Sequence, residues 1–105
     1  MNAPPRTVRD LIPTEAAWLG AMIEGEGSIT AEKSGGFMVS VSNTSVETIA
    51  TCLRLAGCGG VLLYPRDQRG DRKPLWRWAI TCALDVFWLL QQIMPYLTGK
   101  QELAL

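Results

Sequence analysis

Histidine is absent from this sequence of 105 residues, and its three cysteines form no Cys-x-x-Cys pair. The chain therefore has neither the ligand spacing of a zinc finger nor the histidine that a Cys/His protease or a histidine general base requires. Cys52 and Cys82 lie in apolar runs, where we expect small buried side chains. Unpaired thiols of this kind fit a reducing, intracellular compartment.

Net charge and long apolar runs are lacking as well. Ten basic and ten acidic side chains cancel, so the overall charge does not indicate a nucleic-acid partner. Five basic residues against two acidic ones between Arg66 and Arg77 nevertheless make a local positive patch. No apolar stretch reaches the roughly 18 residues of a membrane span, and the N-terminus has no apolar signal core, so we expect a soluble protein.

Turn residues and hydrophobic periodicity divide the chain into eight elements. We expect a loose lead-in over 1–13 and a single domain over 14–105, because this length holds one core. Thr14 is the expected N-cap of the first helix, and Thr44 with Glu47 predicts a capping box for the second. The predicted elements are helices over 15–25, 45–56, 83–94 and from 95 onward, and strands over 28–33, 37–43, 61–66 and 75–81.

Two hairpins separated by a helix, with helices at both ends, predict an α+β sandwich of order αββαββα(α). One antiparallel four-stranded sheet then carries its helices on one face. Period-2 alternation places Phe37, Val39, Val41, Leu63 and Trp78, among others, on the face that meets the helices. The opposite face is small and polar with arginines, and no helix is left to cover it. It is either a solvated face or a platform for an extended polar partner such as DNA.

The stretch WLGAMIEGEGSI ends a helix of small and apolar side chains with two glutamates. Ala17, Gly20, Ala21 and Glu24 share one side at helical spacing. Small residues there permit either close approach of a second helix or tight packing within the chain. The negative end of the helix dipole disfavours the carboxylates of Glu24 and Glu26 unless a cation joins them, and hard oxygen ligands suit Mg²⁺.

The nine residues LGAMIEGEG, 19–27, resemble the LAGLIDADG motif of homing endonucleases. Gly20-Ala21 inverts the usual Ala-Gly, Met22 replaces Leu or Phe, and both acidic residues are Glu instead of Asp. Leu19 and the final glycine of the motif match. The motif thus predicts the fold of that family, with a DNA-binding saddle on the open face of the sheet.

The resemblance extends over about residues 14–102. It includes the Asn43-Thr44 pair before the second helix, the glycine-rich turn before the third strand and the Pro-Tyr-Leu-x-x-Lys pattern at 95–100. The motif occurs once, and single-motif members of the family act as homodimers. The resemblance therefore implies a homodimeric, site-specific endonuclease that hydrolyses both strands of a long pseudo-palindromic DNA target, as a mobile intron-associated element does.

The resemblance also assigns roles to individual residues. Glu26 matches the family's direct metal ligand, with the carbonyl of Gly25 beside it, and the implied ion is Mg²⁺, for which Mn²⁺ or Ca²⁺ substitutes in binding. Lys100 matches a lysine near the active site, and Asn43 matches a polar residue that orders solvent around the metal. Without the resemblance, Lys100 could equally be an ordinary exposed lysine, and Asn43 could equally be a residue that caps the second helix. Glu24 has no settled role.

Two sets of residues complete the predicted sites. The dimer interface is expected at Ala17, Gly20, Ala21 and Glu24. The DNA contacts are expected at the open face and its turn, namely Thr30, Glu32, Ser34, Met38, Ser40, Ser42, Tyr64, Arg66, Arg69, Arg72, Lys73 and Arg77.

Two other functions stay open at the level of sequence. A DNA- or RNA-binding protein without catalysis, such as an intron maturase or a regulator, would share the platform but would not need Glu26 to bind metal. A small α+β interaction domain would use Trp76, Trp78 and Trp88 only as core and would bind no nucleic acid. In the nuclease interpretation the protein is intracellular and DNA-associated, in a prokaryotic cytoplasm or an organelle.

Overall fold

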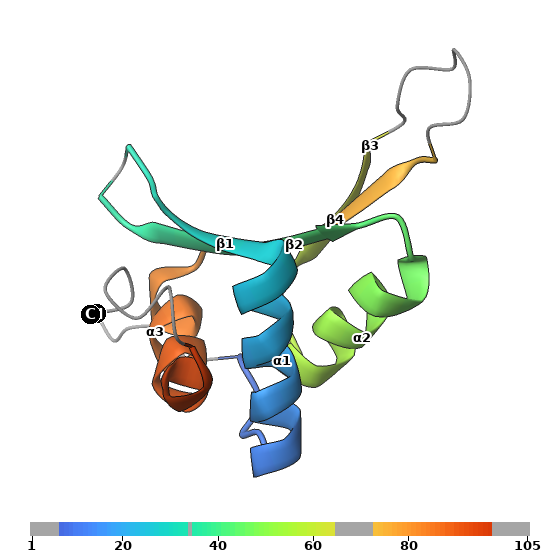
Figure 1. Ribbon diagram of the computed structural model, residues 1–105. Helices are drawn as coiled ribbons and strands as arrows, with labels where there is room; N and C mark the ends of the chain where they lie inside the picture. Colours follow the sequence, from blue (N-terminus) through green and yellow to red (C-terminus); the bar gives the residue numbers. More distant parts are fainter. Residues whose placement is uncertain (1–6, 34, 65–72, 98–105) are drawn as a thin grey trace.

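Three helices cover one face of a single four-stranded antiparallel sheet in the computed structural model, which describes residues 7–33, 35–64 and 73–97 (Figure 1). The elements are α1 (Pro13–Glu26), β1 (Gly27–Ala31), β2 (Phe37–Asn43), α2 (Val46–Ala56), β3 (Gly60–Tyr64), β4 (Leu75–Ile80), α3 (Ala83–Ile93) and the 3₁₀ turn η1 (Met94–Tyr96). The predicted fold class and the order of its first seven elements are confirmed. The helix predicted from 95 onward is instead the 3₁₀ turn η1 followed by an extended Leu97, and the rest of that segment lies outside the described residues. None of the helices that the structure describes has the length and apolar character that crossing a bilayer requires.

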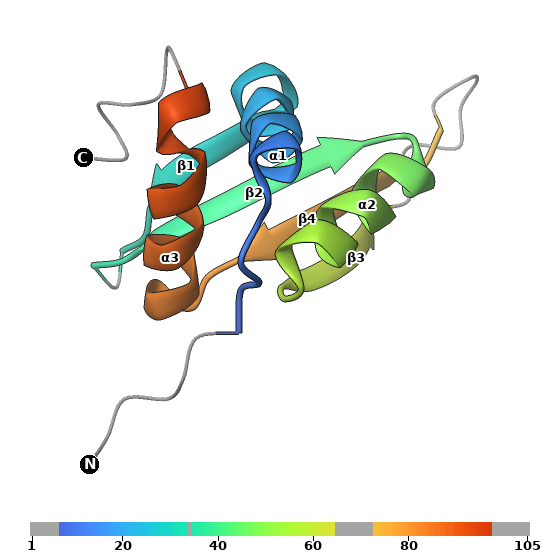
Figure 2. The ribbon, with the colours of Figure 1, turned by 90° about the horizontal axis from the view of Figure 1, so that it is seen from below.

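The strands lie in the order β1-β2-β4-β3. The two predicted hairpins, β1–β2 and β3–β4, are therefore joined through the inner strands β2 and β4. Figure 1 shows the sheet curving away from the helices toward both hairpin ends. Figure 2, seen from the helix side, shows α1 between α3 and α2. The opposite face of the sheet has no described helix over it.

The core lies between the middle of the sheet and the three helices. Val39, Val41 and Trp78 are fully buried there, as the alternation predicts. Phe37 and Leu63, predicted on the same face, are instead 40% and 46% exposed. Both lie near hairpin ends, where the sheet extends beyond the helices. Strand alternation therefore predicts on which face a side chain lies, but not whether a helix covers it there.

Two helix caps differ from those predicted. Helix α1 begins at Pro13 with Ile12 as its N-cap, and Glu15 Oε1 accepts a hydrogen bond from the Ile12 amide at 3.1 Å. Proline is common at the first helical position, where its missing N–H leaves no donor unsatisfied. The helix therefore begins at Pro13, and Thr14 lies inside it. Helix α2 begins one residue later than predicted, because Ser45 Oγ accepts the Thr48 amide at 3.2 Å.

The N-terminal segment 7–12 is a strap pinned to the domain, and the predicted loose lead-in is corrected for these residues. The carboxylate of Asp85 on α3 accepts the Thr7 amide and hydroxyl, each at 2.7 Å, and the Val8 amide at 3.3 Å. Further along α3, Gln92 Oε1 accepts the Leu11 amide at 2.6 Å. The Arg9 amide donates to the carbonyl of Ala56 at the end of α2. The strap therefore ties α3 to α2 across the side of the domain remote from the open face.

Candidate functional site

Glu26 and Asn43, which lie 17 residues apart, meet where α1 passes into the sheet. Glu26 is the last residue of α1, and Asn43 is the last residue of β2. The side-chain amide of Asn43 donates a hydrogen bond from Nδ2 to Glu26 Oε2. Asn43 Oδ1 accepts the Ser45 amide at 2.8 Å, which orients the Asn43 amide with its NH₂ group toward the carboxylate. The structure thus brings together two of the predicted catalytic residues.

Gly27, the final glycine of the motif, makes this arrangement possible. It follows Glu26 directly and begins β1, where it pairs with Val41 of β2. A Cβ atom at position 27 would lie 2.6 Å from the carbonyl oxygen of Ser40 and 2.8 Å from the Cα of Ile23. Both are backbone atoms and cannot move aside cheaply. Only glycine lets the helix turn into the sheet this tightly, with Glu26 left exposed at the junction.

The buried thiol of Cys52 lies within the electrostatic influence of Glu26. Burial raises the pKa of Cys52 to about 12, and the negative charge of Glu26 adds to the rise. The thiol therefore stays protonated at neutral pH and serves neither as nucleophile nor as metal ligand. Cys82, predicted to be buried, is exposed, because it is the N-cap of α3 and lies outside the helix's apolar side.

The donors at this junction fit Mg²⁺ as an ion shared with a bound phosphate. Among the described residues no group of three His, Cys, Asp or Glu side chains could hold a metal. Glu26 offers an exposed carboxylate, and Gly25 belongs to the last turn of α1, whose carbonyls lack partners within the helix. Mg²⁺ is commonly bound by one or two carboxylates together with substrate phosphates and water, which matches this donor set.

The open face of the sheet carries the predicted DNA-contacting residues that lie in strands. Thr30 and Tyr64 are exposed, and Met38, Ser42 and Arg77 are half-buried. Ser40 is only 5% exposed; its Oγ lies 3.2 Å from Ser28 Oγ of the paired strand. Beyond the strands, Glu32 is half-buried in the β1–β2 turn and Lys73 is exposed before β4. Ser34, Arg66, Arg69, Arg72 and Lys100 lie outside the described residues.

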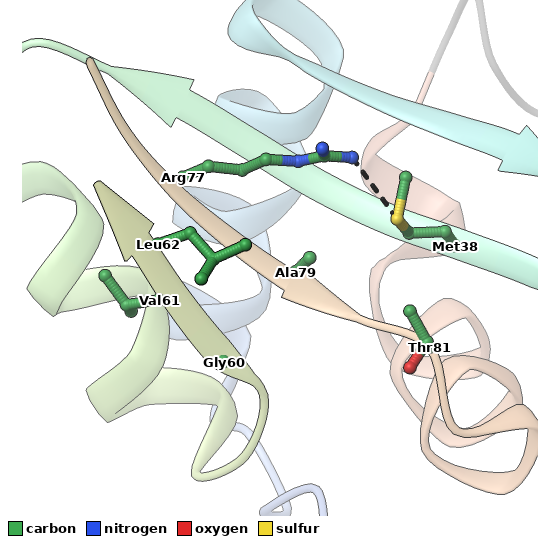
Figure 3. Close-up of a pocket in the computed structure, with 7 residues that line it drawn as sticks. All are labelled: Met38, Gly60, Val61, Leu62, Arg77, Ala79 and Thr81. Atoms are coloured by element: carbon green, nitrogen blue, oxygen red, sulfur yellow. Dashed lines mark hydrogen bonds between the residues drawn. The ribbon is translucent and has the colours of Figure 1, made fainter. Parts of the chain in front are cut away.

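Arg77 borders a hollow of about 370 Å³ on this face (Figure 3). Its guanidinium donates to Met38 Sδ at 3.2 Å and to the Tyr64 hydroxyl at 3.5 Å. Gly60, Leu62, Ala79 and Thr81 also line the hollow and were absent from the predicted contacts. Alternation along β3 and β4 could have placed these residues on the open face. A small or apolar side chain, however, does not by itself indicate that it contacts a ligand.

The side of α1 that carries Ala17, Ala21 and Glu24 is only partly covered in the part of the chain that the structure describes. Ala21 is exposed, and the other two are half-buried. Gly20, predicted to share this side, is buried within the chain instead. A Cβ at position 20 would lie 2.8 Å from the Cβ of Tyr96, so glycine here lets η1 pack directly on α1. The sequence left open whether the small residues of α1 pack within the chain or against a second helix, and Gly20 packs within the chain.

The fold has counterparts among solved DNA-bound proteins. The chain is similar to the homing endonuclease I-CvuI in complex with the I-CreI target in the presence of 2 mM Mg, where the DNA is not cleaved. That match has a TM-score of 0.63 at 16% identity, over 87% of this chain and 61% of the other. I-CvuI in complex with its own target in the presence of 2 mM Ca matches with a TM-score of 0.60 at 17% identity, over 88% and 62%.

The fold is that of a LAGLIDADG homing endonuclease. The chain spans about three fifths of the length of these neighbours. No protein-family model matches the sequence, and neither does any curated protein. The similarity is therefore one of fold, at 16–17% identity.

Proposed function

We propose that this protein is a site-specific DNA endonuclease that acts as a homodimer and hydrolyses one phosphodiester bond on each strand of a long pseudo-palindromic target. The observation that carries the proposal is the Glu26 carboxylate, oriented by Asn43 beside an open sheet face in a fold that I-CvuI also has. Metal-dependent cleavage of a randomised pool of DNA duplexes tests it. The mobile intron context that the motif implies belongs to the same proposal.

The chain's own groups have distinct tasks in this reaction. Glu26 and the carbonyl of Gly25 would hold Mg²⁺, and Asn43 orients the Glu26 carboxylate by donating to one of its oxygens. The bound ion supplies charge neutralisation at the phosphate and an activated water at neutral pH. Lys100 contributes an ammonium that stabilises the negative charge developing on the phosphate. Glu24, half-buried on the interface side of α1, is assigned to the dimer contact and not to metal binding.

The open face supplies DNA binding in this proposal. The hydroxyls of Thr30 and Ser42 contact the bases directly or through water, as the polar surface of such interfaces commonly does. Lys73 and the arginines of the β3–β4 turn contact phosphates, which would make binding strongly dependent on salt. The protein would accordingly be DNA-associated inside the cell.

Dimerisation would place the partly covered side of α1 against the same side of a second copy. Alanines at this contact let two helices approach closely, and a two-fold axis there brings the two Glu26 carboxylates together at the centre of the target. Two adjacent carboxylates repel each other unless cations lie between them, which is a second reason to expect a divalent ion.

Ala21→Glu is expected to convert the dimer of about 23 kDa into a monomer of 11.5 kDa. The added side chain separates the helices, and the added charge would be buried without a partner. Ala50→Glu is the matched control, because Ala50 is an exposed alanine on α2. Sedimentation of both variants and the wild type at micromolar concentration gives the masses. A wild type that is monomeric, or an Ala21→Glu variant that stays dimeric, would contradict the paired-helix interface.

A DNA-binding protein without catalysis is the second candidate. It is favoured by the described residues, among which no group of three His, Cys, Asp or Glu side chains could hold a metal. This candidate predicts that the wild type binds DNA duplexes but cuts none of them with Mg²⁺.

A further inference from the structure

The open face of the four strands carries a single charged side chain. Arg77 is the one Asp, Glu, Lys or Arg among the residues of β1, β2, β3 and β4. It lies on β4, which has strands on both sides, and its Cα partners are Ser42 of β2 and Leu62 of β3. The centre of the face therefore has a lone cation with apolar and hydroxyl neighbours and no carboxylate in the strands.

The hollow beside Arg77 follows from the register of the strands. The row behind Ser42, Arg77 and Leu62 on the same face consists of Ser40, Ala79 and Gly60, which are paired across β2, β4 and β3. Because these three residues are small, they form a low floor between taller side chains. Met38 and Thr81 line its far side (Figure 3).

The position of the guanidinium is restrained over this floor. Its hydrogen bonds to the Met38 sulfur and the Tyr64 hydroxyl hold it from two directions, and in Figure 3 the Arg77 side chain extends along the sheet toward Met38. Neither partner is charged, and the described strands hold no carboxylate that would neutralise Arg77. A planar fork of donors held in place suits an acceptor pair on a flat edge, which lysine cannot match.

We propose that this hollow is a base-reading subsite in which Arg77 recognises a guanine and the floor accepts the methyl group of a neighbouring thymine. The proposal rests on the proposed DNA-binding function of the open face. In the major groove guanine presents the O6 and N7 acceptors that arginine binds in a bidentate manner, and thymine presents a methyl group that favours apolar contact. Leu62, which is 60% exposed, and Ala79 supply that apolar surface next to the guanidinium.

A phosphate contact for Arg77 fits the position less well. The phosphates flank the groove, whereas a central strand of a sheet that enters the groove faces the base edges. An apolar floor next to the cation also serves a methyl group better than it serves a charged, hydrated phosphate. In a two-fold symmetric target the guanine–thymine step would occur once in each half-site, at mirrored positions.

Selection of bound duplexes from a randomised pool tests the subsite. The wild type, Arg77→Lys and Ala79→Leu are compared in the presence of Ca²⁺, with Arg54→Lys on the exposed side of α2 as the matched control. Unchanged thermal unfolding establishes that each variant is folded. The affinity of each protein for the wild-type consensus and for its single-base changes is then measured.

The wild type is expected to prefer guanine at one position of each half-site by about 5- to 150-fold, which is the range for a bidentate arginine contact. Arg77→Lys should lose that preference and keep the others, Ala79→Leu should lose the adjacent thymine preference, and Arg54→Lys should change nothing. The subsite is overturned if Arg77→Lys selects the same consensus as the wild type, or if the position that it alters is not guanine. Failure of the wild type to enrich any sequence would instead overturn the proposed function.

Discussion

Replacing Glu26 with glutamine is expected to abolish DNA cleavage while dimerisation and DNA binding persist. Glutamine keeps the shape of the side chain and can still accept the hydrogen bond from Asn43, but it lacks the charge that holds a divalent cation. Loss of the metal's contribution, several kcal/mol of transition-state stabilisation, lowers the cleavage rate by about three orders of magnitude or more. Single-turnover cleavage with Mg²⁺ and a parallel binding titration measure the two effects separately.

Glu47→Gln is the matched control for this experiment. Glu47 is an exposed glutamate in the first turn of α2, and its Oε2 accepts the Ser45 hydroxyl at 3.3 Å, whereas Asn43 accepts the separate Ser45 amide. Its replacement removes one negative charge near the site without touching Glu26. We expect cleavage close to that of the wild type. Equal cleavage rates for Glu26→Gln and the wild type would show that Glu26 takes no part in DNA cleavage.

Asp85→Asn is expected to destabilise the fold by about 2–4 kcal/mol. The carboxylate accepts three hydrogen bonds from the N-terminal strap, and hydrogen bonds to a charged acceptor contribute about 1.5–3 kcal/mol each before losses elsewhere. Asparagine keeps one acceptor oxygen for the amides of Thr7 and Val8, and it turns an NH₂ group toward the Thr7 hydroxyl in place of the second acceptor. Urea unfolding of the wild type and the variant at pH 7 measures the difference.

Glu47→Gln again serves as the control, because Asp85 and Glu47 are the acidic residues in the first turns of α3 and α2. Both interact favourably with a helix dipole, a contribution of about 0.3–1 kcal/mol. Only Asp85 holds the strap, so a loss for Asp85→Asn no larger than that for Glu47→Gln would show that the strap adds nothing to stability.

The pH dependence of this stabilisation has a definite sign. Burial opposes ionisation of Asp85, but the hydrogen bonds from Thr7 and Val8 outweigh it and hold the pKa of the carboxyl below its usual range. A group whose pKa is lower in the folded than in the unfolded state stabilises the fold above the unfolded-state value of about 3.9. That stabilisation is lost as the pH falls through the folded-state pKa. The difference in the free energy of unfolding between the wild type and Asp85→Asn should therefore be constant from pH 7 to about pH 5 and become smaller near pH 3.

Local patterns in the sequence were sufficient to predict the sheet and its faces. Alternation along β2 and β4 depends only on the pleat, and the glycine-rich segment after α2 fixes where that helix ends. Helix α2 ends at Gly57 in the left-handed conformation, and its φ of 79° favours glycine whatever the tertiary context. Among the candidate site residues, Glu26 was indicated by its place at the negative end of a helix dipole and by the resemblance to a known motif, and Asn43 by the resemblance alone.

Long-range contacts explain what the sequence did not reveal. The strap depends on Asp85 and Gln92, which lie about 80 residues from their partners and give no local signal. Gly20 looked like part of a helix–helix contact because a small residue gives the same pattern whether it faces a second copy or Tyr96 of its own chain. The direct hydrogen bond between Asn43 and Glu26 likewise needed the register of β1 and β2.

Incubation of the purified wild type with a pool of randomised DNA duplexes and Mg²⁺, followed by sequencing of the cut ends, tests the central claim most directly. The account predicts cleavage of both strands within a two-fold symmetric consensus, with no cleavage by Glu26→Gln. Binding of duplexes without any cut ends would contradict the nuclease function and favour a DNA-binding protein without catalysis. Absence of both binding and cleavage at low salt would contradict DNA as the ligand of the open face.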